Sequence, residues 1–146
     1  MGNYTSYLII PEKKLIITNF QGSITMNDLI QLNLLFISDN SYDSTFDLLM
    51  DFRESTALAF KMEIADFFDF FKKNISLKKK IHSGILFSTP NLNFLISVYK
   101  PPAMLMNIEA EGFREINKCL EWMRFSVEDQ VIIIEALNSI KSKPTD

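Results

Sequence analysis

The segment Leu48-Leu49-Met50-Asp51-Phe52-Arg53-Glu54-Ser55-Thr56 decides the fold of this chain. Its first half is a short apolar run, which is typical of a buried parallel strand. Its second half turns polar, and a Phe-rich stretch with helical spacing follows. Open α/β sheets form their binding sites at the carboxyl ends of such strands. We therefore expect Asp51 and Arg53 to occupy the position of greatest chemical interest.

Outward from this segment the chain alternates between strand and helix patterns. Two strand-like runs, residues 7–10 and 15–20, flank a Pro-Glu-Lys-Lys turn and predict an antiparallel hairpin. Further strands are expected at residues 47–52, 81–87 and 105–113, and helices at residues 25–38, 60–75, 92–99, 114–124 and 126–140. Pro101 and Pro102 are expected to end the third of these helices. This succession predicts an α/β fold with a mixed five-stranded sheet, an N-terminal hairpin plus parallel strands, covered by four to five helices.

Composition limits the class of protein. The 146 residues predict a single domain, in which residues 126–146 form a C-terminal helical extension and tail. Hydrophobic residues make up 47% of the chain, including 13 Phe, so a packed core is available. A net charge of −3 and a pI of about 5.2 argue against a nucleic-acid partner. The lone Cys119, with no signal peptide or membrane span in the pattern, predicts a cytoplasmic protein.

Few residues suit catalysis or cofactor binding. One His and one Cys cannot supply a zinc site, and four Gly cannot build a dinucleotide or phosphate cradle. His82 lies near the start of an expected strand and is interpreted as structural rather than as a triad member. Residues 39–44 lack the Gly and Glu of a calcium loop. We therefore expect no metal, no cofactor and no enzymatic activity; an enzyme that uses Asp51 and Arg53 is the weakest alternative.

Polar side chains follow two of the expected strands. The first group is Asp51, Arg53, Glu54, Ser55 and Thr56, and the second is Ser88, Thr89 and Asn91. Because neighbouring parallel strands end at the same edge, the two groups should lie within reach of each other. One interpretation is structural: Asp51 pairs with Arg53, and the hydroxyls cap helices. The other is a docking groove switched by phosphorylation of Ser55 or Thr56 near a helix start. The Lys78–Lys80 run is interpreted as a solvated strand entrance.

The expected helices carry more apolar residues than one sheet can cover. Residues 26, 29, 30, 33, 34 and 37 share one face of the helix at 25–38. The residues off the sheet-facing stripes are Leu32, Leu35 and Phe36 in that helix, and Met62 and Phe70 in the Phe-rich helix. Such a surplus needs a second cover, so we expect these residues or the last helix to contact another protein in a homodimer. The alternative is a carrier or sensor of a small apolar ligand, lined by Phe67, Phe71 and Leu95.

The order of the segments resembles that of small bacterial STAS-like proteins, which share the fold of the sporulation anti-sigma factor antagonists. The resemblance covers the chain up to about residue 124. The segments that carry it are residues 7–20, Gly22-Ser23-Ile24-Thr25, residues 48–53, and Phe113-Arg114 leading into Cys119-Leu120-Glu121-Trp122-Met123. It implies a five-stranded sheet and a non-enzymatic regulatory or ligand-binding role. The family's phosphorylated serine implies Ser55 or Thr56, although Arg53 and Glu54 stand where that family has small residues. Related folds that bind apolar ligands keep the carrier alternative open.

Overall fold

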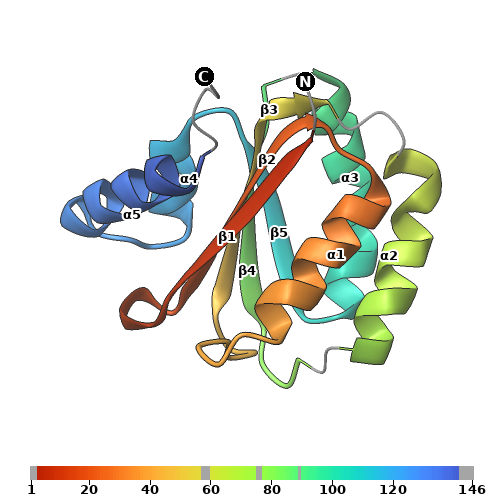
Figure 1. Ribbon diagram of the computed structural model, residues 1–146, viewed down its shortest axis with the longest axis horizontal. Helices are drawn as coiled ribbons and strands as arrows, with labels where there is room; N and C mark the ends of the chain where they lie inside the picture. The colour runs from red at the N-terminus through yellow and green to blue at the C-terminus, as the bar shows by residue number, and fades with distance from the viewer. Residues whose placement is uncertain (1–2, 57–59, 75–76, 89, 142–146) are drawn as a thin grey trace.

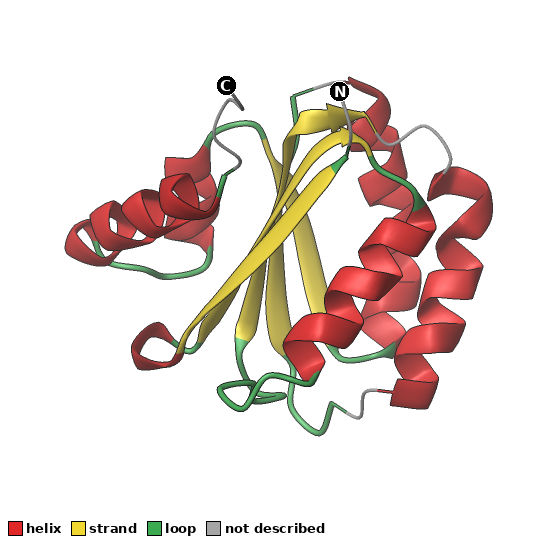
Figure 2. Cartoon of the chain, in the orientation of Figure 1, coloured by secondary structure: helices red, strands yellow, loops and turns green. Residues whose placement is uncertain are grey.

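The computed structural model describes residues 3–56, 60–74, 77–88 and 90–141. Its centre is a five-stranded sheet, drawn in yellow in Figure 2. The strand order is β1-β2-β3-β4-β5, the same as the order along the chain. β1 (Tyr4–Ile10) is antiparallel to β2 (Leu15–Ser23). β3 (Asp47–Thr56), β4 (Ile81–Leu86) and β5 (Ile108–Phe113) then add in parallel. The predicted mixed α/β sheet is confirmed.

Helices cover both faces of this sheet (Figure 1). α1 (Met26–Ile37), α2 (Phe60–Asn74) and α3 (Pro90–Leu105) lie on one face. α4 (Ile116–Trp122) and α5 (Val127–Ile140) lie on the other. Alternate residues of each strand therefore point into two separate cores. The first core is the larger and includes Phe20, Met50, Phe52, Phe67 and Phe71, and the second includes Ile17, Leu49, Leu86, Cys119, Leu120, Ile133 and Leu137.

Local signals in the sequence set several element ends. Pro11 begins a short 3-10 turn between β1 and β2, and Lys14 closes it in the left-handed region at φ 51°. Thr25 caps α1 with a capping box: its hydroxyl accepts from the Asp28 N–H, and the Asp28 carboxylate accepts from the Thr25 N–H. Ser126 caps α5 in the same position by accepting from the Asp129 N–H. These helix starts were correctly predicted.

The buried face of α1 differs from the predicted one. Leu32 and Phe36 are 2% and 3% exposed and face the sheet, whereas Leu34 and Leu35 are 37% and 60% exposed. The prediction that Leu32 and Phe36 form an exposed interface is therefore wrong, and only Leu35 of the three is available. The helix is apolar on nearly every side, so its periodicity did not fix which stripe faces the sheet.

Pro101 and Pro102 do not end α3, which continues to Leu105. Proline removes a helical hydrogen bond, yet the next residue, Ala103, is fully buried in the first core. Packing of this last turn against the sheet offsets the lost bond. The turn into β5 then uses Asn107 in the left-handed region, φ 64°, with its side-chain amide donating to the Leu77 carbonyl.

Candidate functional site

A β-bulge in β3 shapes the candidate site. Asn19 of β2 pairs with Asp51, and Gln21 pairs with Glu54, so Phe52 and Arg53 together oppose the single residue Phe20. The extra residue shifts the alternation of β3 by one position. Paired residues of parallel strands point to the same side of a sheet, so Asp51 and Glu54 both face α4 and α5. An unbroken strand would have pointed them to opposite faces.

Asp51 is a fully buried carboxylate whose lone pairs are occupied. Its Oδ1 accepts from the Arg53 backbone N–H at 3.0 Å and from Arg53 Nε at 2.9 Å. Its Oδ2 accepts from Arg53 Nη2 at 3.0 Å and from Asn19 Nδ2 at 3.4 Å. A carboxylate offers about four acceptor positions, and all four are used here. Asp51 is thus paired within the protein, as the structural interpretation predicted.

Arg53 completes this pair from the side open to solvent. Its side chain is 26% exposed, whereas the side chain of Asp51 is 1% exposed. The hydrogen bonds to Asp51 are the largest cause that raises the pKa of Arg53, and burial opposes them. The guanidinium therefore stays charged and bound to Asp51. Asn19 Oδ1 lies beside them, buried and without a hydrogen-bond partner among the residues that the structure describes.

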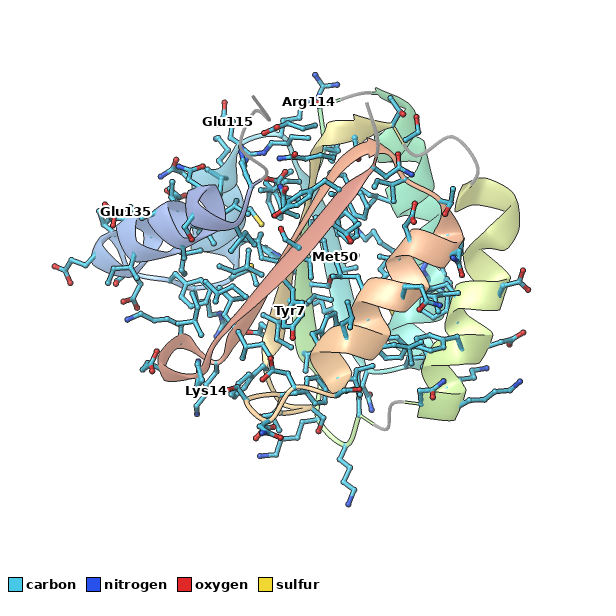
Figure 3. The ribbon with its side chains drawn as sticks, in the orientation of Figure 1. Tyr7, Lys14, Met50, Arg114, Glu115 and Glu135 are labelled. Carbon is cyan, nitrogen blue, oxygen red and sulfur yellow. The ribbon has the colours of Figure 1, made fainter. Side chains whose placement is uncertain are left out.

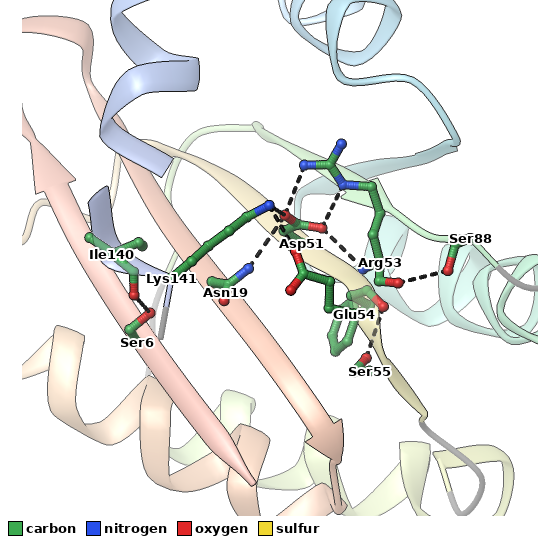
Figure 4. Close-up of polar contacts among 10 residues, drawn as sticks. Ser6, Asn19, Asp51, Arg53, Glu54, Ser55, Ser88, Ile140 and Lys141 are labelled. Atoms are coloured by element: carbon green, nitrogen blue, oxygen red, sulfur yellow. Dashed lines mark hydrogen bonds and ion pairs between the residues drawn. The ribbon is translucent and has the colours of Figure 1, made fainter. Parts of the chain in front are cut away.

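The end of α5 closes over the same place (Figure 4). Lys141 Nζ lies 2.9 Å from Glu54 Oε1 and 4.0 Å from Asp51 Oδ2. The Ile140 carbonyl accepts from Ser6 Oγ at 2.8 Å and from the Tyr4 hydroxyl at 3.1 Å. Four contacts thus fix the C-terminal end of α5 to β1 and β3, and they limit access to the Asp51–Arg53 pair.

The polar groups predicted at the two strand ends meet only in part. Ser88 Oγ donates to the Arg53 carbonyl at 2.7 Å, which joins the ends of β3 and β4 as expected. Ser55 is 5% exposed and donates to the Phe52 carbonyl at 2.9 Å. Thr56 is exposed and donates to Ser23 Oγ at 3.4 Å. Thr89 lies outside the described residues, and Asn91 lies in α3 with its side chain outside them. Of the two predicted phosphorylation sites, only Thr56 is accessible.

The remaining nucleophile and the histidine are held in structural contacts. Cys119 is buried, and burial raises the pKa of its thiol to about 12. A thiol with such a pKa is not a nucleophile at neutral pH. His82 Nε2 lies 3.0 Å from Glu109 Oε2, and its ring packs edge-on against Trp122. No group of three or more His, Cys, Asp or Glu side chains that could hold a metal ion occurs among the described residues.

The rings predicted to line an apolar ligand site fill the first core instead. Phe67 and Phe71 are 2% and 4% exposed, and their ring centroids are 5.7 Å apart. A hollow beside Phe71 holds only about 20 Å³, far less than the roughly 300 Å³ of the smallest ligand pockets. Leu95 and Met62 have side chains outside the described set. Phe70 is half-buried, with its ring 6.5 Å from that of Phe67.

Two residues of the site were missed from the sequence. Asn19 interrupts the apolar run of β2 with an amide, a signal that marks a polar partner across the sheet. Lys141 follows the last apolar turn of α5 and carries no such signal. Its contact to Glu54 joins residues far apart in the chain.

This is the fold of STAS-like proteins, as the order of segments predicted. A solved structure is similar to the chain: an uncharacterised protein of the DUF3478 family with a SpoIIAA-like fold, from Shewanella loihica PV-4. The TM-score is 0.55 at 16% sequence identity, over 83% of this chain and 93% of that one. No protein-family model and no curated protein matches the chain. Among the described residues, no helix is both long and apolar enough to cross a membrane.

Proposed function

We propose that the protein is a non-catalytic cytoplasmic module that acts by contact with another protein, and that this partner is a second copy of the same chain. The observation that carries the proposal is an apolar strip on the outer side of α5. Val127 and Val131 are 77% and 53% exposed, and Ile134 continues the strip with half-buried side-chain atoms. We call these three residues the α5 strip.

The α5 strip has the spacing of a helix–helix contact. Its members are separated by four and three residues, so they form one line along the helix. Ile133 and Leu137 hold the adjoining side of α5 in the second core, and Ile134 packs partly against that core. Glu135, the residue after Ile134, points away from the sheet (Figure 3). The strip can pack on its own copy across a two-fold axis, and an antiparallel helix pair also aligns the two helix dipoles favourably.

The polar residues support contact rather than turnover. The Asp51 carboxylate is saturated by Arg53 and Asn19, and the Cys119 thiol is buried. Catalytic acids and bases need a free position within hydrogen-bond reach of a substrate. A phosphorylation switch remains part of the proposal at Thr56, the accessible one of the two predicted hydroxyls.

Sedimentation velocity over a range of protein concentrations tests the proposal. We expect the wild type to form dimers and Val131→Glu to be monomeric, because the substitution puts a charge in the middle of the strip. Ile132→Glu is the matched control: Ile132 is 47% exposed on the same helix but lies on the other flank of its outer side. This variant should remain dimeric. A wild type that is monomeric at every concentration, or equal loss in the two variants, would contradict the proposal.

A further inference from the structure

The end of the molecule opposite to the Asp51 site carries a group of lysines. Lys72 and Lys73 form the last turn of α2, and Lys78, Lys79 and Lys80 lead into β4. All five are exposed. We call them the lysine patch. Figure 1 shows the end of α2, the entrance to β4 and the turn from α3 to β5 at this same end of the sheet.

The lysine patch is largely uncompensated. None of its five ammonium groups makes an ion pair with a residue of the described ranges, whereas Lys13, Lys100 and Lys141 elsewhere do. Hydrogen bonds from Thr45 are the main cause that lowers the pKa of the Asp43 carboxyl, and the charge of Lys79 contributes less, so Asp43 offsets part of the charge of the patch. Because the whole chain has a net charge of −3, this basic end contrasts with an acidic remainder.

Two large apolar side chains stand beside these lysines. Met104 and Leu105, at the end of α3, are 71% and 88% exposed, and Leu105 is the most exposed large apolar side chain among the described residues. Lys80 and Met104 line the same groove of about 260 Å³, together with the charged residues Lys100, Glu109 and Glu111. The Asn107 side chain binds the Leu77 carbonyl and so ties the end of α3 to the segment that carries the lysines. Basic and apolar groups thus share one surface.

We propose that this surface docks the protein on anionic phospholipid headgroups, with Met104 and Leu105 entering the boundary between headgroups and acyl chains. Each lysine near an anionic bilayer raises the affinity of a protein for that bilayer about fivefold, and a partly buried apolar side chain raises it further. The composition favours a lipid surface over a protein partner, because protein interfaces are depleted in lysine and enriched in arginine and aromatic residues. The patch holds five lysines and no arginine. Nucleic acid would leave Met104 and Leu105 in water.

Vesicle co-sedimentation tests the proposal with the full chain. We expect binding to vesicles of phosphatidylcholine with one third phosphatidylserine, and none to phosphatidylcholine alone. The variant Lys78→Gln/Lys79→Gln/Lys80→Gln should bind on the order of a hundredfold more weakly. The variant Met104→Ser/Leu105→Ser should lose about tenfold. High salt should weaken binding of the wild type, because it screens the lysines.

A matched control removes three exposed cations that are not part of the patch, in Arg114→Gln/Lys118→Gln/Arg124→Gln. Figure 3 shows Arg114 at the opposite end of the molecule. This variant has the same net charge as the lysine variant, and its binding should stay within about threefold of wild type. The urea midpoints of both variants should lie close to that of the wild type, because all six residues are exposed and the contact of Arg114 with the Phe87 ring, 5.8 Å from the ring centroid, is weak.

Three outcomes would overturn the proposal. They are no binding of the wild type to phosphatidylserine vesicles, a loss of affinity in the control variant equal to that in the lysine variant, or an unchanged affinity in Met104→Ser/Leu105→Ser. Binding of polyglutamate or RNA as tightly as of vesicles, with no effect of those two residues, would indicate an acidic polymer instead. The test is separate from the α5 strip, since none of these variants changes that helix. Either proposal can fail alone.

Discussion

Removal of the Arg53 charge tests what holds Asp51 in the protein interior. In Arg53→Met, Asp51 loses the Nε and Nη2 donors and keeps the backbone N–H at 3.0 Å and Asn19 at 3.4 Å. Loss of one partner from a buried ion pair costs 3–5 kcal/mol. Arg53 is one-quarter exposed and Lys141 lies 4.0 Å from Asp51, so we expect a loss at the lower end, about 3 kcal/mol.

The double variant Asp51→Leu/Arg53→Met should recover most of this loss. It removes both charges, and replacing a buried ion pair by apolar residues is often neutral. Asn19 then loses its acceptor, which costs about 1 kcal/mol. We therefore expect the double variant to lie within about 1 kcal/mol of the wild type, and to be clearly more stable than Arg53→Met.

Urea unfolding followed by Trp122 fluorescence measures both free energies. Trp122 is the single tryptophan and packs against Phe113 and His82, so its emission reports unfolding of the sheet face that α4 and α5 cover. Lys118→Met is the control, an exposed cation of α4 for which we expect a change of less than about 0.5 kcal/mol. A loss below about 1 kcal/mol in Arg53→Met, or a double variant as unstable as that single one, would refute the reasoning.

Three further predictions concern other contacts. Gly84→Ala would bring a methyl group to 2.4 Å from Cys119 Sγ and 2.9 Å from Met123 Sδ, and should cost about 1–3 kcal/mol in urea unfolding. Adding Cys119→Ala should restore part of it. The Cys119 thiol, with its pKa raised to about 12 by burial, should not react with an aromatic disulfide reagent until the protein unfolds; rapid labelling of the native protein would contradict this. In Tyr7→Phe the pKa of Asp39, lowered first by the Ser41 N–H and then by the Tyr7 hydroxyl, should rise part of the way to its usual value in a carbon NMR titration. The lowered pKa stabilises the fold above the ordinary aspartate pKa and this stabilisation is lost as pH falls, so the variant should show a smaller loss; an unchanged Asp39 pKa would count against the bond.

The sheet could be predicted from sequence because its central strands are covered on both faces. Such strands appear as continuous apolar runs, for example at residues 48–50, and do not depend on which face is which. The helix starts at Thr25 and Ser126 were predictable for a different reason: an N-cap is a local interaction between residues close in the sequence. The buried face of α1 was not predictable. Leu32, Leu34 and Leu35 belong to different apolar stripes of the helix, and only packing against the assembled sheet decides which stripe is buried.

The sequence predicted the centre of the candidate site and missed part of its surroundings. Asp51 and Arg53 are two residues apart, and their pairing follows from that spacing. The bulge at Phe52 and Arg53 is a feature of the register between β2 and β3, so the sequence of either strand alone does not predict it. Lys141 contacts Glu54, which lies 87 residues earlier in the sequence. Contacts of this kind depend on how α5 packs, which periodicity does not specify.

The identical order of strands in the sequence and in the sheet has a consequence for how the chain is made. As the polypeptide leaves the ribosome, each new strand can join the outer edge of those already assembled, and none has to be inserted between two neighbours. The exception to this outward growth is α5, which returns to β1 and β2. A nascent chain held just before Val127 would contain all five strands, with the first two still bare on one side. The last helix to be synthesised therefore packs against the first two strands and completes the second core.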